Sequence, residues 1–160
     1  MTIVAHGREL LFGRIVKDEM KLSLMGEIAR GEWFKTANLR KNVKLREDEF
    51  VVMPNHIHGI LWIEGNNDEN VGARRRRAPT EGFGTPTIGS LSTIIRAYKS
   101  AVTYAINESR GTRGALVWQR NYYERVIRSE VEHERIYWYI SSNPFRWEKD
   151  EENPECQILP

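Results

Sequence analysis

Two histidines stand two residues apart inside the apolar stretch VVMPNHIHGILWI, residues 51–63. If this stretch is a β-strand, His56 and His58 point to the same side, about 6–7 Å apart along the strand. Two imidazoles on one sheet face can bind a single divalent metal ion through their ring nitrogens. An H-x-H pair is a weak signal by itself, because two histidines can equally be satisfied by backbone groups and water.

A second candidate group comes much later in the chain. Tyr139 and Asn143 are four residues apart, so on a helix they share one face, roughly 5–6 Å apart at Cβ. They would present a phenol and, one turn further on, a carboxamide oxygen that can bind a metal. The alternative is that Tyr139 packs against the protein and Asn143 ends the helix before Pro144; spacing alone does not separate the two. Combined with the histidines, the pattern indicates attack of a tyrosine oxygen on a metal-polarised phosphodiester.

The basic residues are concentrated in the middle of the chain. Residues 74–128 contain eleven Lys and Arg against three Glu, in a chain whose formal net charge is +2. Such a concentration predicts a surface for a polyanion, although charged runs are more often simply solvated. Candidates for phosphate contacts are Lys99, Arg96, Arg74, Arg75, Arg76, Arg77, Arg120, Arg125 and Arg128.

The spacing of apolar residues predicts the elements that must position these groups. Alternation and turn signals indicate sheet strands at residues 2–6, 42–53, 56–64 and 121–128, with a small hairpin at 11–22 that turns at Lys17-Asp18. Pro54-Asn55 suits the centre of a tight turn. Helical spacing indicates helices at 23–39, at 90–107, and from a capping box at Ser129–Glu132 to about Ser142 or Asn143.

These elements follow the order β-α-β-β-α-β, with one further helix at the C-terminal end. The order predicts an α+β, ferredoxin-like fold: an antiparallel sheet with two helices on one face, and an additional helix that carries Tyr139. The length fits a single domain, residues 1–160. Residues 65–89, rich in Gly, Asn, Pro and Arg, are expected to form a long, mobile basic loop.

The segments MPNHIHGIL and WQRNYYERVIRSEVEHERIYWYISSNPFRW together resemble the single-tyrosine HUH (His-hydrophobic-His) transposases. The similarity is greatest to the REP-associated branch, whose tyrosine stands in a Y-I-x-x-N-P motif, and it extends from about Phe12 to Trp147. The resemblance implies that His56 and His58 bind Mg²⁺ or Mn²⁺, that Asn143 completes the metal site, and that Tyr139 is the nucleophile.

The resemblance also implies a substrate and a reaction. Proteins of this family cut single-stranded DNA near hairpins, leaving a 5′-phosphotyrosine link and a free 3′-OH, and the REP-associated branch acts on repeated palindromes. The alternative is a hairpin-binding protein derived from a transposase that does not cut. A metal-free RNA-binding domain of the same fold fits less well, because the aromatic pair on its central strands is missing. The sequence leaves open a monomer or a homodimer, and whether Tyr139 acts within its own subunit.

Other tyrosines compete with Tyr139 for the nucleophile role. Tyr122 and Tyr123 lie on a predicted strand, with no metal-competent partner at a matching offset. Tyr137 belongs to the packing side of the last helix, together with His133 and Ile136. Tyr98 and Tyr104 lie on the middle helix, and Tyr98 is part of its apolar stripe.

Cysteine use and hydropathy indicate where the chain works. A lone cysteine, Cys156, cannot form an internal disulfide, so a reducing compartment is expected. No apolar run reaches the 18–20 residues of a membrane helix, and no signal-peptide pattern follows Met1. We therefore expect a cytoplasmic protein, associated with the nucleoid through DNA and without a membrane partner.

Overall fold

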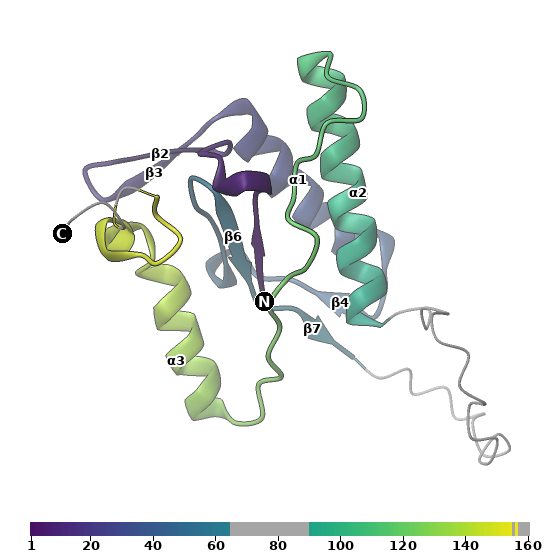
Figure 1. Cartoon of the computed structure of the whole chain (residues 1–160). Helices are drawn as coiled ribbons and strands as arrows, with labels where there is room; N and C mark the ends of the chain where they lie inside the picture. Colours follow the sequence, from purple (N-terminus) through teal and green to yellow (C-terminus); the bar gives the residue numbers. More distant parts are fainter. Residues whose placement is uncertain (65–89, 155, 157–160) are drawn as a thin grey trace, which may run out of the picture.

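The computed structural model describes residues 1–64, 90–154 and 156, which form a mixed α+β structure (Figure 1). The helices are α1 (Leu24–Leu39), α2 (Leu91–Arg110) and α3 (Glu130–Ser141), with short 3₁₀-helices η1 (His6–Arg8), η2 (Glu47–Glu49) and η3 (Pro144–Lys149). The strands are β1 (Thr2–Val4), β2 (Gly13–Val16), β3 (Glu19–Leu22), β4 (Val43–Lys44), β5 (Phe50–Val52), β6 (His56–Gly59) and β7 (Trp62–Ile63). The predicted α+β class is confirmed, whereas the predicted basic loop at 65–89 lies outside the described residues.

The central sheet has the strand order β1-β6-β5, and both pairings are antiparallel. Thr2 of β1 lies opposite His58, and Val4 lies opposite His56. The expected turn at Pro54-Asn55 joins β5 to β6, where the Met53 amide donates to the His56 carbonyl at 2.8 Å. This pairing places the two histidines on a central strand of the sheet, with a neighbouring strand on each side.

Local sequence signals account for the smaller hairpin and the helix ends. The β2-β3 hairpin turns at Lys17-Asp18, as predicted, and both residues have left-handed φ values of 52° and 62°, which match the right-handed twist of the two strands. Ser23, Ser90 and Ser129 each accept a hydrogen bond from a backbone amide in the first turn of α1, α2 and α3. α2 runs three residues beyond its predicted end, to a left-handed Gly111.

Helices α1 and α2 pack against each other and against one face of the sheet. Ile57 of β6 belongs to the same apolar core as Trp33 of α1 and Tyr98 of α2. Helix α1 approaches β6 so closely that a Cβ on Gly59 would lie 2.6 Å from Trp33 Cζ2. This position therefore needs glycine. α3 stands apart from this pair of helices, with β1 and β6 between them in Figure 1.

The second and third predicted strands are interrupted, so their prediction as continuous strands was wrong. Residues 42–53 form β4, then η2, then β5, and residues 56–64 form β6 and β7 with a break at Ile60-Leu61. The break between β6 and β7 lies next to η2, since the Ile60 amide donates to the Glu49 carbonyl at 3.0 Å. The sequence pattern implied a strand in which buried apolar and exposed polar residues alternate. The polar side chain of Glu49 is buried at this junction instead.

The predicted strand at 121–128 is also wrong, because no strand forms there. The chain instead meets the edge of β1 through isolated antiparallel bridges, of Ala5 with Trp118 just before this range and of Thr2 with Tyr123 within it. Within the described part of the chain, no helix is both long enough and apolar enough to cross a membrane.

Candidate metal and nucleophile site

The two histidines of β6 converge on one point. His56 is fully buried and His58 nearly so, and their Nε2 atoms are 2.9 Å apart. The alternation of the strand aims both rings at the face opposite Ile57, as expected from the sequence. The Trp147 ring of η3 lies against His56 on this face, with ring centroids 6.1 Å apart.

The remaining nitrogen of each histidine has a polar partner. His56 Nδ1 is 2.8 Å from Asn55 Oδ1, and His58 Nδ1 is 2.8 Å from Thr2 Oγ1 across the β1-β6 pairing. Burial lowers the pKa of His56 to about 4 and holds the pKa of His58 well below its ordinary value. Both imidazoles are therefore neutral at pH 7, which is the form that binds a metal.

Tyr139 of α3 lies beside this pair. Its ring meets the ring of His58 edge to face, with centroids 5.2 Å apart, and 47% of the residue is exposed. Burial and then the Asp150 carboxylate raise the pKa of Tyr139, while a side-chain hydrogen bond with Asn143 lowers it. The phenol is thus accessible, next to the histidines and linked to the amide predicted to act with it.

Asn143 follows the end of α3, where Ser142 is the capping residue. Asn143 is 1% exposed, and its Oδ1 has no hydrogen-bond partner among the described residues. An unpartnered buried acceptor costs about 1–3 kcal/mol, so such an atom calls for a specific explanation. Asn143 lines the same groove as His58, and an amide oxygen is a suitable ligand for a hard divalent cation.

His56 Nε2 and His58 Nε2 face each other at 2.9 Å, which is the separation of a hydrogen bond between two neutral imidazoles. The two nitrogens are close enough for one divalent ion to bind both. In the described part of the chain no group of three or more His, Cys, Asp or Glu forms a metal site, so the donor set that fits is two imidazoles and an amide oxygen.

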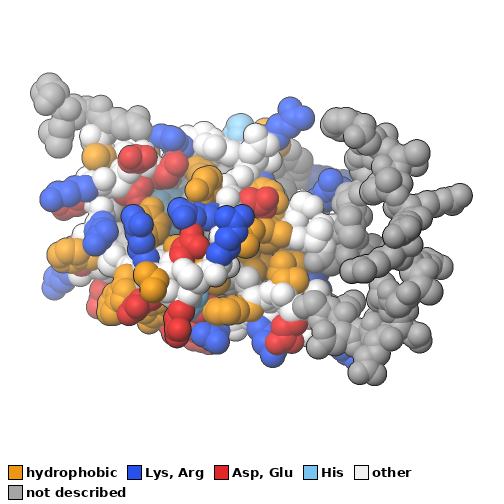
Figure 2. Space-filling view, turned by 90° about the horizontal axis from the view of Figure 1, so that it is seen from below, with side chains coloured by type: hydrophobic (Ala, Val, Ile, Leu, Met, Phe, Trp, Pro, Cys, Tyr) orange, Lys and Arg blue, Asp and Glu red, His pale blue; other side chains and the backbone are white. Residues whose placement is uncertain are grey.

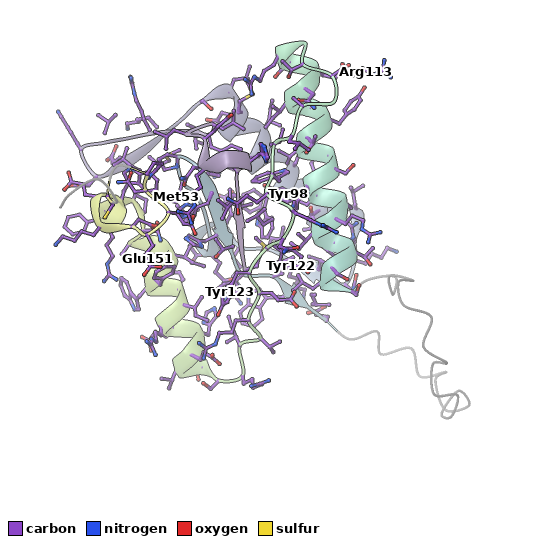
Figure 3. All side chains as sticks on the ribbon, viewed as in Figure 1. Met53, Tyr98, Arg113, Tyr122, Tyr123 and Glu151 are labelled. Atoms are coloured by element: carbon purple, nitrogen blue, oxygen red, sulfur yellow. The ribbon has the colours of Figure 1, made fainter. Side chains whose placement is uncertain are left out.

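A groove of about 1100 Å³ runs past His58, Tyr139 and Asn143. Its other walls include the acidic residues Asp18, Glu148, Asp150, Glu151 and Glu152 and the basic residues Arg146 and Lys149. Figure 3 shows Glu151 beside the turn that follows α3. Carboxylates therefore outnumber cations on this side of Tyr139, and their charge favours a metal ion over a phosphate.

The predicted DNA contacts differ in their surroundings. The Lys99 ammonium donates to the carbonyl oxygens of Gln119 and Arg120 at 2.6 and 3.3 Å. Lys99 therefore joins α2 to residues 119–120, which follow it in the chain. Arg125 forms an ion pair with Glu132 at 2.6 Å. Among the predicted contacts, Arg96, Arg120 and Arg128 are exposed and form no ion pair with a described residue. Arg74, Arg75, Arg76 and Arg77 lie outside the described residues. Basic and acidic side chains also mix over the face in Figure 2.

A buried carboxylate attaches α3 to the rest of the protein. Glu49 of η2 is 1% exposed, and its oxygens accept from Trp62 Nε1 at 2.5 Å and from His133 Nε2 at 2.8 Å. Arg46 also reaches Glu49, at 3.3 Å. The sequence assigned His133 to the packing side of the last helix, and its ring does pack against Trp62, with ring centroids 5.2 Å apart. The sequence did not predict the contact with a carboxylate from a distant segment.

The other tyrosines are arranged less favourably for nucleophilic attack. Tyr98 is buried, and its hydroxyl donates to the Ala29 carbonyl at 3.0 Å. Tyr122 and Tyr123 lie in the segment beside β1, between α3 and α2 in Figure 3. Tyr123 lines the groove and is 65% exposed, which makes it a useful comparison for Tyr139.

Sequence reasoning missed three residues of the site, namely Thr2, Asn55 and Glu49. Asn55 was interpreted only as a turn residue, although it stands next to the H-x-H pair and could have been suspected on that ground. Thr2 becomes a partner of His58 through the β1-β6 register, which the sequence does not specify. Nothing local distinguishes Glu49 from its acidic neighbours in REDE.

Comparison with known proteins identifies a relative in Haemophilus influenzae, described as an uncharacterized protein. It is 37% identical over 155 residues, which cover 94% of this chain and 82% of the relative. No protein-family model and no solved structure matches the chain. The similarity extends over nearly the whole of this chain and most of the relative, and the chain belongs to the same family as this Haemophilus influenzae protein.

Proposed function

We propose that this protein is a metal-dependent single-stranded DNA endonuclease and strand transferase, which acts at hairpin DNA through a 5′-phosphotyrosine intermediate. The observation that carries the proposal is the meeting of two neutral histidines, an accessible tyrosine and an unpartnered amide oxygen at one groove. This is the set that the single-tyrosine HUH transposases use, and the REP-associated branch is the group to which we assign the chain. The reducing compartment expected for such an enzyme is the cytoplasm, at the nucleoid.

The arrangement of the sheet supports a ferredoxin-like fold as part of this proposal. Residues 118–123 lie beside β1, β1 beside β6, and β6 beside β5. This is the neighbour order expected when a β-α-β-β-α-β chain folds in that way. α1 and α2 cover one face, and α3 carries Tyr139 to the other, as the transposase assignment requires.

In the proposed reaction, bound Mg²⁺ or Mn²⁺ would polarise the phosphodiester and stabilise the charge that develops on it. His56, His58 and Asn143 would hold the ion. The Tyr139 oxygen attacks phosphorus and loses its proton; the bond from phosphorus to the 3′-oxygen breaks, and that oxygen leaves as a 3′-OH after taking up a proton. The 5′-phosphotyrosine conserves the bond energy, so a 3′-OH can attack it in the reverse direction and rejoin strands.

The test uses a hairpin-containing oligonucleotide with an unpaired flank, incubated with Mn²⁺ and analysed for a covalent adduct on a denaturing gel. The wild-type protein and Tyr123→Phe, a tyrosine of the same groove, are expected to form the adduct, whereas Tyr139→Phe is expected to form none. An adduct that persists in Tyr139→Phe would overturn the assignment of the nucleophile.

A second candidate function is binding of hairpin DNA without cutting. The observation that favours it is the raised pKa of Tyr139, caused by burial and by Asp150, which keeps the phenol protonated. Under this alternative, the protein binds the hairpin tightly but leaves it intact at every Mg²⁺ and Mn²⁺ concentration tested.

A further inference from the structure

We propose that Asn55 is a positioning residue of the metal site, which fixes the proton of His56 on Nδ1 and so keeps His56 Nε2 ready to bind a cation. The inference rests on the metal-binding part of the proposed function. It gives a role to a buried side chain that touches a histidine without being a candidate ligand itself.

The orientation of the Asn55 amide follows from its surroundings. Asn55 Nδ2 donates to the carbonyl oxygens of Glu152 and Arg8, at 2.6 and 3.3 Å. Carbonyl oxygens only accept hydrogen bonds, so the amino group of Asn55 has to face them. If the amide were reversed, an oxygen would oppose two oxygens in a fully buried position, which is strongly unfavourable.

The amide orientation in turn determines the tautomer of His56. Asn55 Oδ1 faces His56 Nδ1 at 2.8 Å, and an amide oxygen only accepts, so Nδ1 carries the proton. In the neutral imidazole the lone pair then lies on Nε2, which is the atom that faces His58. Hydrogen bonds of this kind orient metal-binding imidazoles in proteins.

His58 differs, because its partner can serve either tautomer. The Thr2 hydroxyl can donate to His58 Nδ1 or accept from it. Without a cation, His58 Nε2 carries the proton that lies between the two rings, because His56 Nε2 has none. If a cation were bound, His58 would carry its proton on Nδ1 instead and donate it to Thr2 Oγ1. His56 is thus the fixed ligand of the pair, and His58 is the adaptable one.

The carbonyls that orient Asn55 come from two distant segments. The Arg8 guanidinium forms a 3.0 Å ion pair with the Glu152 carboxylate, which joins these segments. The Glu152 amide donates to Asp150 Oδ1 at 2.7 Å. The tautomer of His56 therefore depends on the docking of residues 150–152 against η1.

The experiment measures the proton and the metal without DNA. The ¹⁵N NMR spectrum of the wild-type imidazoles at pH 7.5 in EDTA should show His56 as the Nδ1–H tautomer. A wild-type His56 protonated on Nε2 would overturn the proposal, whatever the behaviour of any variant. Titration calorimetry with MnCl₂ then compares the wild type with Asn55→Leu, which has a similar size but neither donor nor acceptor.

We expect Asn55→Leu to bind Mn²⁺ roughly 10–100-fold more weakly and to show a mixture of His56 tautomers. Thr2→Val is the matched control, since it removes the partner of His58 and should leave the His56 tautomer unchanged. A folded Asn55→Leu protein with wild-type Mn²⁺ affinity would sink the inference while leaving the endonuclease proposal intact. A wild type that has the Nδ1–H tautomer and binds Mn²⁺, but never forms an adduct, would sink only the endonuclease proposal.

Discussion

The two faces of strand β6 are built from different chemistry. On one face, Ile57 belongs to an apolar core to which α2 contributes four buried residues, namely Ile95, Tyr98, Val102 and Ile106. On the other face are His56 and His58, next to α3. Of the twelve residues of α3, all of which the structure describes, only Ile140 is buried. α2 is held by burial of apolar surface, whereas α3 buries little of its surface and is also attached through the polar contact of His133 with Glu49.

This difference separates stability from chemistry within a single strand. Apolar burial on the Ile57 face supplies most of the stabilising free energy. The histidine face contains buried polar groups, which lower the free energy of unfolding and are found in natural proteins mainly at functional sites. Changes on the two faces should therefore have different consequences, and the following four predictions test the difference.

The largest effect on stability is expected for Ile57→Ala. Ile57 is completely buried in the apolar core, and such truncations cost about 2–5 kcal/mol in free energy of unfolding. Urea denaturation followed by circular dichroism measures the loss. A loss below about 1 kcal/mol would show that the α1-α2 face does not dominate stability.

Acidification should lower the free energy of unfolding of the protein through the buried His56. The native pKa of His56, about 4, lies below its ordinary value of 6.5, so below pH 6.5 the unfolded state binds a proton that the native state excludes. The stabilisation present above pH 6.5 is lost as the pH falls toward 4, by about 3 kcal/mol for a shift of this size. Urea midpoints in EDTA between pH 7 and pH 4 measure it. His56→Gln is the control, and parallel losses in the two proteins would contradict the assignment to His56.

A smaller effect is expected for Glu49→Gln, which removes the buried charge that holds His133. The expected loss is about 1–3 kcal/mol, and amide hydrogen exchange should become faster in α3 while α2 is unaffected. Glu47→Gln is the matched control in the same 3₁₀-helix, because its ion pair with Arg30 is exposed and exposed pairs contribute little. Equal acceleration in α2 and α3 would mean that Glu49 supports the whole fold rather than α3.

The smallest effect on stability is expected for Tyr139→Phe, within about 0.5 kcal/mol, because the residue is half-exposed. Tyr98→Phe provides the comparison on the other face. It removes a buried hydrogen bond to the Ala29 carbonyl and should cost about 1 kcal/mol. Thermal denaturation of both variants tests the order, and a larger loss for Tyr139→Phe would reverse it.

Local signals made much of the fold predictable. The hairpin turn at Lys17-Asp18, the start of α1 after Ser23 and the turn at Pro54-Asn55 were all predicted from residues within a few positions of each element. The interruption at η2 was not predictable in this way. The alternation around Glu49 reads as a strand until the contact of Glu49 with His133, 84 residues away, is known.

The relative positions of two site residues were predictable where both residues belong to the same strand or helix. The two-residue period of a strand placed His56 and His58 on one side, and the helical spacing placed Tyr139 near Asn143. The positions relative to one another depend on how β6, α3 and η3 come together, which involves no local signal. The same holds for Asn55, whose role depends on the backbone of Arg8 and Glu152.

The contact of Asn55 with the Glu152 carbonyl also has a consequence for folding kinetics. It joins residues 97 positions apart, and the contact of Glu49 with His133 joins residues 84 positions apart. Closing such long loops has an entropic cost, and the contacts offset this cost only once the rest of the chain is compact. The α3 side of β6 should therefore assemble after the folding transition state, with φ-values near zero for Asn55 and Glu49. Changes there should accelerate unfolding and leave the folding rate almost untouched.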